Sequence, residues 1–339
     1  MLKERLLALI DGFGDRRVLV VGDIIADEFI YGEISRVSRE APVLILKYDA
    51  TEMVAGGAGN AASNVAALGG RAVLAGLVGR DAEGRRLMTG LPRRVDRSHI
   101  VRARQYRTPV KTRILAGGVH SAKQQVVRID RDTAWPLAEA VSRAFAAKVS
   151  SALAQCDAVV LSDYGSGLIT PGLAQTIRRA LAGKAKRRIP LLVDSRYQLF
   201  QYQGMTTCTP NESEVEQLLG VRIDDDVDVL ERAGREVLRR TRSGAVLITR
   251  GSRGMALFQP RRSTIHIPIV GSDEVADVTG AGDTVIATFA LALAAGATFH
   301  EAALLANYAG GLVVMKRGTA TVSPRELSAA IGSDSDGRA

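Results

Sequence analysis

The chain has 339 residues, of which 46% are hydrophobic and 24% are charged, which is typical of a globular protein with one large or two small domains. Its net charge is +9, but the basic clusters at 85–113 and 178–188 contain only one aromatic residue, Tyr106, so they offer no stacking platform for nucleic acid. No apolar run is long enough to span a bilayer and the N-terminus lacks a cleavage site, so we expect a cytoplasmic protein that does not bind membranes.

Short β-branched segments alternate with amphipathic segments along most of the chain. We expect a helix at the N-terminus and strands at 18–22, 73–78, 158–162, 191–194, 206–209 and 245–249. Further helices are expected at 59–68, 137–154, 171–182, 212–219 and 229–240, and two long ones at 281–295 and 300–316. This alternation predicts an α/β fold in which helices cover both faces of a mostly parallel sheet.

Two stretches, 27–50 and 100–130, interrupt the alternation because they have the pattern of strands without intervening helices. They are expected to form a small antiparallel sheet, a lid over the carboxyl ends of the main strands, where open α/β sheets bind ligands. We find no internal repeat and no linker, so we expect one domain over 1–329 and a disordered polar tail over 330–339. Exposed edges of the lid sheet also predict a homodimer that forms through the lids.

The segment DVTGAGDT at 277–284 places Gly280, Ala281 and Gly282 directly before a long apolar helix. Small residues let the unpaired amides of a first helical turn converge on an anion, and the helix dipole favours negative charge there. A carboxylate beside that anion is useful if it accepts a proton from the attacking group, so Asp283 is a candidate base for phosphoryl transfer. The alternative is that Asp283 only caps the helix.

The segment TPNESE at 209–214 follows a strand, and its Asn211 and Glu214 share one face of a helix start. Such oxygen ligands suit Mg²⁺ that is held largely through water beside nucleotide phosphates. The alternative is a capping box, in which Asn211 caps the helix and Glu214 reaches back to it. Both interpretations can hold together.

The segment GGAGN at 56–60 allows a ligand to approach the backbone closely, and Asn60 and Asn64 present amides that suit sugar hydroxyls. A rival interpretation is a dinucleotide fingerprint, Gly57-x-Gly59-x-x-Ala62, which would indicate a dehydrogenase that binds NAD. The preceding TEMVA is a poor strand and weakens this rival. No G-x-x-x-x-G-K-[ST] motif is present.

These three motifs, in this order, resemble the signatures of the ribokinase-like (PfkB) sugar kinases. The chain is most similar to the D-glycero-β-D-manno-heptose-7-phosphate kinases, including the kinase half of bifunctional ADP-heptose synthases. The similarity lies in VVGDIIADEFIYGEISRVSREAPVLIL, GGAGNAASNVAALGG, LSDYGSGLI, TPNESE, DVTGAGDTVIATFALALAAG and ANYAGGLVVMKRGTATVSP, and it extends over about 17–327. It implies a ribokinase-like three-layer αβα core with a lid, ATP and Mg²⁺ as cofactors, and K⁺ as a further cation.

The resemblance also implies site residues, position by position. Asp283 matches the catalytic base, Gly280, Ala281 and Gly282 match the anion hole, and Asn211 and Glu214 match the site of Mg²⁺ and ATP. Asp27, Gly57, Asn60 and Asn64 match sugar-binding positions, Thr249, Arg250, Gly254 and Asn307 match nucleotide-binding positions, and Asp277 and Thr279 match the monovalent-cation site.

The lid supplies further candidates. Arg128 and Asp130 lie where its inner strand should face the substrate, and Lys111 and Arg113 are candidates for binding a substrate phosphate because of their charge and lid location. The alternative for Lys111 and Arg113 is a solvated lid surface.

Two segments depart from the heptose kinases. Ser166 replaces a lysine of the pattern S-D-Y-x-K-G, and Ser195-Arg196 replaces the Pro-Lys of D-P-K-G. Arg196 keeps a cation near the ATP phosphates, but its planar guanidinium differs from a lysine's point charge.

The sequence therefore predicts an ATP- and Mg²⁺-dependent sugar kinase with Asp283 as base, acting on the anomeric hydroxyl of heptose 7-phosphate for lipopolysaccharide precursor synthesis. Alternatives are a PfkB kinase for another sugar or a nucleoside, an NAD-dependent dehydrogenase, and an inactive sugar-binding module.

Overall fold

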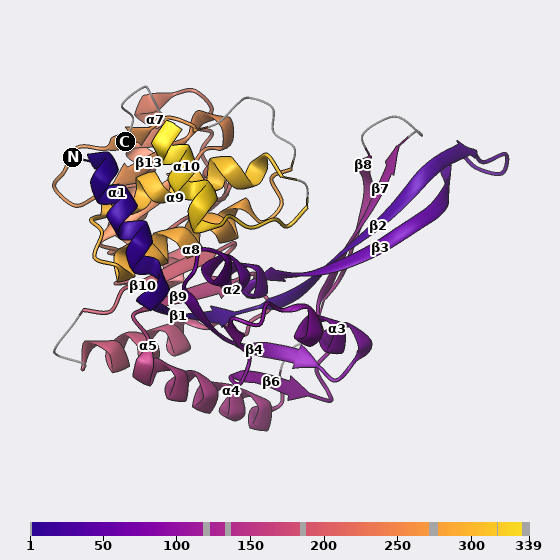
Figure 1. Cartoon of the computed structure of the whole chain (residues 1–339), viewed down its shortest axis with the longest axis horizontal. Helices are drawn as coiled ribbons and strands as arrows, with labels where there is room; N and C mark the ends of the chain where they lie inside the picture. The colour runs from indigo at the N-terminus through magenta and orange to yellow at the C-terminus, as the bar shows by residue number, and fades with distance from the viewer. Residues whose placement is uncertain are drawn as a thin grey trace.

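A mostly parallel sheet runs through the body of the protein in this computed structural model, which describes residues 2–117, 123–132, 137–183, 188–270, 277–316 and 318–333 (Figure 1). Within these residues the sheet has ten strands in the order β14-β13-β12-β11-β10-β9-β1-β4-β5, and β6 also pairs with β4. The parallel strands are β1 (Arg17–Gly22), β4 (Arg71–Gly79), β5 (Val95–Asp96), β6 (Ile100–Ala103), β9 (Ala158–Asp163), β10 (Leu191–Ser195), β11 (Thr207–Cys208) and β12 (Ala245–Thr249). Two antiparallel strands, β13 (Met255–Phe258) and β14 (Ile265–Ile267), complete one edge.

Helices cover both faces of this sheet because alternate residues of each central strand point to opposite sides. In β1, Val18 and Val20 belong to the hydrophobic cluster that also includes residues of α1 (Leu2–Asp11), α2 (Ala58–Ala67), α3 (Ala82–Gly90), α8 (Ala281–Ala294), α9 (Phe299–Val314) and α10 (Pro324–Ser333). Leu19 and Val21 belong to the cluster on the other face, which includes residues of α4 (Glu139–Ala152), α5 (Pro171–Ala182), α6 (Glu212–Leu219) and α7 (Val227–Thr241). Short 3₁₀ helices lie at Gly12–Asp15, Leu153–Gln155, Leu199–Gln201 and Gly251–Arg253. The predicted layered α/β fold is confirmed.

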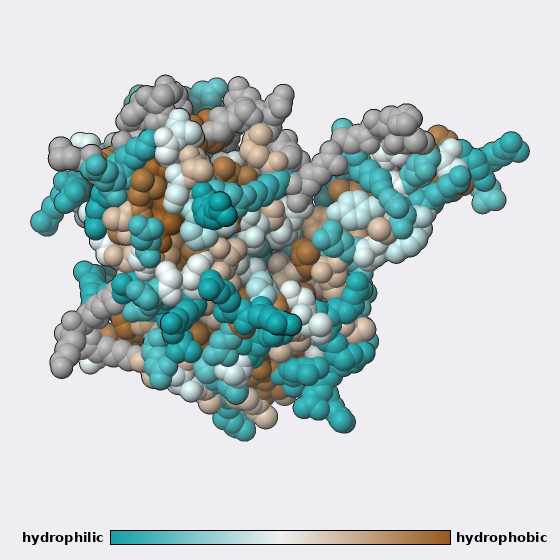
Figure 2. Space-filling view, viewed as in Figure 1, coloured by the Kyte–Doolittle hydropathy of each residue, from teal (hydrophilic) through white to brown (hydrophobic). Residues whose placement is uncertain are grey.

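The lid is a four-stranded sheet that projects from the body as an arm (Figures 1 and 2). Its order is β3-β2-β7-β8, formed by β2 (Ile24–Val37), β3 (Leu44–Gly57), β7 (Val110–Gly117) and β8 (Gln124–Arg131). The outer pairs are antiparallel, whereas β2 and β7 run parallel. The predicted range 100–130 begins too early, because β6 pairs with β4 and belongs to the main sheet.

The helix α8 fixes one end of the candidate site. It is apolar all round and buried along nearly its whole length, where it packs against α9, α2 and strands of the sheet. Its first turn, at Gly280–Asp283, therefore has a fixed position relative to the sheet.

Other elements differ from the predictions. The sequence patterns missed α3, α10, β13 and β14. The segment predicted to be disordered, 330–339, overlaps the last four residues of α10, which reaches Ser333, and 334–339 lie outside the described residues. Among the helices that the structure describes, none is long and apolar enough to cross a membrane.

Packing between α7 and β13 predicts a sharp effect of one methyl group. A Cβ at Gly234 would lie 2.2 Å from Phe258 Cζ in the buried layer, so Gly234→Ala should lower the free energy of unfolding by about 1–3 kcal/mol. The control is Gly90→Ala in α3, where no atom lies within 4 Å, and there alanine should be neutral or slightly stabilising. Denaturant unfolding measures both, and equal stabilities would contradict the packing.

Candidate active site

Two adjoining cavities open at the carboxyl ends of the parallel strands, with volumes of about 300 and 550 Å³. These volumes lie within the range of small-molecule sites. The first is lined by lid residues, by the strand ends Asp163, Asp194 and Thr209, and by the start of α8. The second lies between α8, α9 and the segment 249–255. Both are lined by Asn211, Thr249, Val278 and Gly282, so one ligand can extend from one cavity into the other.

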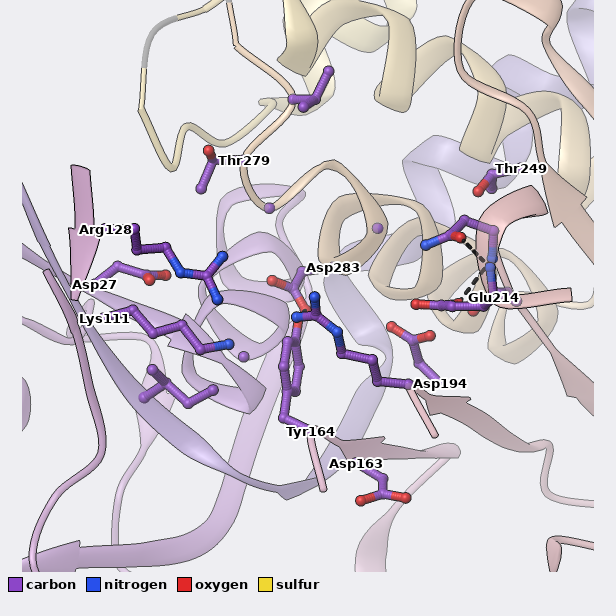
Figure 3. Close-up of a pocket in the computed structure, with 18 of the residues that line it drawn as sticks. Asp27, Lys111, Arg128, Asp163, Tyr164, Asp194, Glu214, Thr249, Thr279 and Asp283 are labelled. Carbon is purple, nitrogen blue, oxygen red and sulfur yellow. Dashed lines mark hydrogen bonds between the residues drawn. The ribbon is translucent and has the colours of Figure 1, made fainter. Parts of the chain in front are cut away.

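Asp283 lies between the two sides of this site. In Figure 3 its carboxylate has Lys111 and Arg128 of the lid on one side and Glu214 and Thr249 on the other. It accepts hydrogen bonds from Asn60 Nδ2 at 2.8 Å and from the Tyr164 hydroxyl at 3.0 Å. Burial raises the pKa of Asp283 to about 7, although these two hydrogen bonds and the Lys111 charge act in the opposite direction. Such a carboxylate is suited to accept a proton near neutral pH.

The first turn of α8 provides backbone donors. Gly280 has a left-handed φ of 77°, and a Cβ there would lie 2.4 Å from Asn60 Nδ2, so glycine is required for two reasons. The Ala281 amide donates to Val278 O at 3.2 Å, and the Thr284 amide donates to Gly280 O at 3.2 Å. For the other two first-turn amides, those of Gly282 and Asp283, the described residues provide no backbone acceptor in the loop before α8. In the predicted anion site, the amides of Gly282 and Asp283 are thus available to a ligand, whereas the Ala281 amide already has an acceptor.

The two asparagines of α2 do not line either cavity. Asn60 donates to Asp283, and Asn64 is fully buried and donates to Asn60 Oδ1 at 3.0 Å. The expected contact of Asn64 with sugar has no support in this geometry, because its amide lies one helical turn behind Asn60 and lines neither cavity. The dinucleotide fingerprint also lacks its context, since the preceding β3 is a lid strand that pairs antiparallel with β2.

The lid brings several charges to the first cavity. Arg113 pairs with Asp27 at 2.5 Å and Arg128 pairs with Asp130 at 2.6 Å, so both guanidinium groups already have a carboxylate partner. Lys111 has no ion pair in the described part of the chain, and its Nζ lies 4.9 Å from the centre of the Tyr164 ring. Burial, followed by the Arg196 charge, lowers the pKa of Lys111. Gly57 completes this side of the cavity.

A group of oxygen atoms lies on the opposite side. Asn211 and Glu214 form the predicted capping box, in which Asn211 N donates to Glu214 Oε2 at 3.0 Å and Glu214 N donates to Asn211 Oδ1 at 2.8 Å (Figure 3). Burial raises the pKa of both Asp194 and Glu214, and for Asp194 the Glu214 charge adds to this effect. The Thr209 hydroxyl is buried without a hydrogen-bond partner among the described residues. Two neighbouring carboxylates and an unused hydroxyl fit a hydrated divalent cation.

The second cavity has an apolar interior formed by Met255, Ile269, Val285 and Val314. The predicted nucleotide residues Thr249, Arg250, Gly254 and Asn307 all line it. Arg250 donates to Glu212 Oε2 at 2.7 Å, and Asn307 donates to Pro268 O at 2.8 Å, so their side chains are held by the protein.

The two residues predicted to bind a monovalent cation differ in their position relative to the cavities. Thr279 lines the first cavity, whereas Asp277 does not line either cavity. The Asp277 carboxylate accepts from the amides of Thr279 at 2.9 Å and Gly318 at 3.1 Å, so it organises the loop before α8.

Asp163, Tyr164 and Asp194 also line the first cavity, although the sequence motifs did not predict them as site residues. Each lies at the carboxyl end of a predicted strand, where open α/β sheets bind ligands, so this position could have identified them as site residues. The two serines that depart from the heptose kinases hydrogen-bond to buried carboxylates: Ser166 to Asp23, and Ser195 to Asp163 at 2.7 Å. Arg196, predicted to lie near the ATP phosphates, lines the first cavity.

Comparison with known proteins identifies the family. The pfkB family carbohydrate kinase domain matches residues 15–326. The chain belongs to the PfkB family of carbohydrate kinases. This PfkB kinase is 40% identical over 325 residues to the bifunctional protein HldE of Pelobacter propionicus and 42% identical over 325 residues to that of Aeromonas salmonicida. Each alignment covers 94% of this chain and 64% of the relative, so the chain spans just under two thirds of the relatives' length.

Solved structures confirm the ribokinase-like fold of this PfkB kinase. Arabidopsis thaliana ribokinase, complexed with ribose and ATP, superposes with a TM-score of 0.72 at 20% identity and covers 93% of this chain and 98% of its own. Escherichia coli phosphofructokinase-2, in complex with fructose-6-phosphate, has a TM-score of 0.71 at 18% identity and covers 94% and 98%.

The contact between Gly280 and Asn60 can be tested by substitution. Gly280→Ala should lower the free energy of unfolding by more than the cost of about 1–2 kcal/mol that a left-handed backbone imposes on alanine. Gly220→Ala is the matched control, because Gly220 has a φ of 66° and a Cβ there would meet no atom within 4 Å, so it carries the backbone cost alone. Thermal and denaturant unfolding give both values. Equal losses would show that Asn60 does not approach Gly280.

Proposed function

We propose that this PfkB kinase transfers the γ-phosphoryl group of ATP to the anomeric hydroxyl of D-glycero-β-D-manno-heptose 7-phosphate, a step in the synthesis of ADP-heptose for lipopolysaccharide. The observation that carries the proposal is the place of Asp283, a carboxylate with a raised pKa at the junction of a charged cavity and a largely apolar one. The six segments that resemble heptose 7-phosphate kinases, and the identity to HldE proteins, support this acceptor.

The geometry provides a route for the reaction. The sugar lies in the first cavity under the lid, and the adenine of ATP lies in the apolar second cavity. Asp283 accepts the proton of the sugar hydroxyl while that oxygen attacks the γ-phosphorus, and ADP leaves from the opposite side. The amides of Gly282 and Asp283 donate to the transferring phosphoryl group, where preorganised donors are most effective. Tyr164 and Asn60 hold the carboxylate in place from two sides.

Mg²⁺ fits the oxygen atoms of Asn211, Glu214 and Asp194, which would hold it largely through water. When bound, it neutralises charge on the β- and γ-phosphates. Arg196 supplies a cation on the same side. We further propose that a K⁺ ion binds near Thr279 and Asp277, where it would stabilise the loop that precedes α8.

The sugar phosphate is assigned to the lid. Arg113 and Arg128 are paired with Asp27 and Asp130. Among the described lid residues that line this cavity, Lys111 is therefore the cation whose charge is not balanced by an ion pair. The Asp27 carboxylate lines the cavity and is in turn available to sugar hydroxyls, whereas Asp130, which was also predicted to bind substrate, lines neither cavity. A purely solvated role for Lys111 is disfavoured because its side chain points toward Tyr164 and Asp283 (Figure 3).

Assembly through the lid is also proposed. Most of the large hydrophobic side chains that are exposed in the described structure belong to the lid: Ile34, Val37, Val43, Leu44, Tyr48, Val126, Val127 and Ile129. Covering them in a homodimer would remove apolar surface from water. We also propose a cytoplasmic location, because the proposed reaction consumes ATP.

The acceptor is tested by a substrate panel. ADP formation should be fastest with heptose 7-phosphate and slower with fructose 6-phosphate, ribose and adenosine. Lys111→Ala should raise KM for the phosphorylated sugar by about 10- to 100-fold, because a hydrogen bond to a charged group contributes about 1.5–3 kcal/mol. Lys123→Ala is the control, since this lid lysine pairs with Asp49 and does not line the cavity. Turnover of neutral sugars alone would contradict the proposal.

The base is tested by the pH dependence of turnover. The ionised carboxylate is the active form of Asp283, so kcat/KM should fall as the pH drops through about 7. Asp283→Asn should reduce kcat by about 10²- to 10⁴-fold, because amides do not accept the proton. Circular dichroism and melting temperature establish that the variant is folded. An Asp283→Asn enzyme as fast as the parent would rule out this base.

A further inference from the structure

A chain of hydrogen bonds runs from Thr284 to the carboxylate of Asp283 through the two asparagines of α2. The Thr284 hydroxyl donates to Asn64 Oδ1 at 2.9 Å, Asn64 Nδ2 donates to Asn60 Oδ1 at 3.0 Å, and Asn60 Nδ2 donates to Asp283 Oδ2 at 2.8 Å. The four side chains are between 0% and 3% exposed, so water does not substitute for these partners. Since Thr284 and Asp283 are neighbours on α8, the chain of bonds leaves α8, crosses to α2 and returns.

The direction of these bonds matters because an asparagine amide can be turned either way. The Thr284 hydroxyl has two acceptors, Asn64 Oδ1 at 2.9 Å and the more distant Gly280 O at 3.4 Å. With its proton on the nearer Asn64 Oδ1, the NH₂ group of Asn64 faces Asn60, and a second contact to Asn60 O at 3.1 Å supports that orientation. Asn60 then presents its NH₂ group to Asp283. If the Asn60 amide were flipped, its carbonyl oxygen would face the carboxylate, and the partial negative charge of that oxygen would repel the carboxylate.

We propose that Asn64 and Thr284 are positioning residues for phosphoryl transfer: they fix the amide of Asn60 so that it donates to Asp283 and holds the base toward the cavity. This inference rests on the proposed role of Asp283 as base. Neither residue lines a cavity, so neither touches a substrate directly.

Loss of this orientation has two consequences. Asp283 keeps only its hydrogen bond from the Tyr164 hydroxyl and can rotate about that contact, and a small misplacement of a catalytic group costs up to about 100-fold in rate. Its pKa also rises, because the Asn60 hydrogen bond favours the ionised form. The other groups that act on Asp283 are Asp27, Lys111, Tyr164 and Asp194, and all of them are unchanged by a substitution at Thr284.

The test compares two threonines of α8. Thr284→Val removes the hydroxyl that begins the chain and keeps the shape of the side chain, whereas Thr284→Ser retains a hydroxyl. Thr288→Val is the matched control: Thr288 is equally buried one turn further along, and its hydroxyl donates to Thr284 O at 2.8 Å outside the chain of bonds. We expect Thr284→Val to lower kcat by about 10- to 100-fold with little change in KM and to move the acid limb of the pH profile to higher pH. Thr284→Ser should restore both, and Thr288→Val should change neither.

A second readout does not need turnover. Carbon-13 NMR of labelled aspartate, with Asp283→Asn for assignment, should show a higher pKa of Asp283 in Thr284→Val than in the parent and in Thr288→Val. Equal behaviour of the two valine variants in kinetics and titration, or no recovery with serine, would overturn the inference. If the parent phosphorylates no sugar, the proposed function fails, and the titration still decides whether the bond chain controls Asp283. Should Thr284→Val not fold, Thr284→Ala removes the same hydroxyl without adding volume.

Discussion

The contact between the first turn of α8 and Asn60 of α2 determines the rest of the site. Placing a carboxylate in a buried position is unfavourable, and burial raises the pKa of Asp283 to about 7. Hydrogen bonds from Asn60 and Tyr164 offset part of this cost and leave a group that changes protonation near neutral pH. Gly280 makes the contact sterically feasible, since any Cβ there would displace Asn60. One small residue thus connects the backbone conformation to the proton affinity of the base.

Charged side chains of two kinds lie on opposite sides of the first cavity. On the lid side, Arg113 and Arg128 are balanced by Asp27 and Asp130, which leaves Lys111 directed toward the centre. On the other side, Asp194 and Glu214 are enclosed together, and burial raises the pKa of both carboxylates. Because Asp27 and Lys111 come from β2 and β7, the lid provides one wall of the first cavity.

Local patterns predicted the elements whose signals lie within one segment. The apolar run after Gly282 predicted α8, and the spacing of Asn211 and Glu214 predicted the capping box that the structure contains. Contacts between distant segments were not predictable in this way. Asn64 suited a sugar ligand by composition, yet its partners are Asn60 and Thr284, and Thr284 lies 220 residues further along the chain. Likewise, Ile100–Ala103 has the pattern of a lid strand, and only its pairing with β4 assigns it to the body.

The most direct test of the account is a crystal structure of the ternary complex with a non-hydrolysable ATP analogue, Mg²⁺ and heptose 7-phosphate. We expect the anomeric hydroxyl at about 2.6–3.2 Å from an Asp283 carboxylate oxygen, with the γ-phosphate analogue at the amides of Gly282 and Asp283. A sugar whose hydroxyls all lie away from Asp283, or a nucleotide bound outside the cavity between α8 and α9, would contradict it.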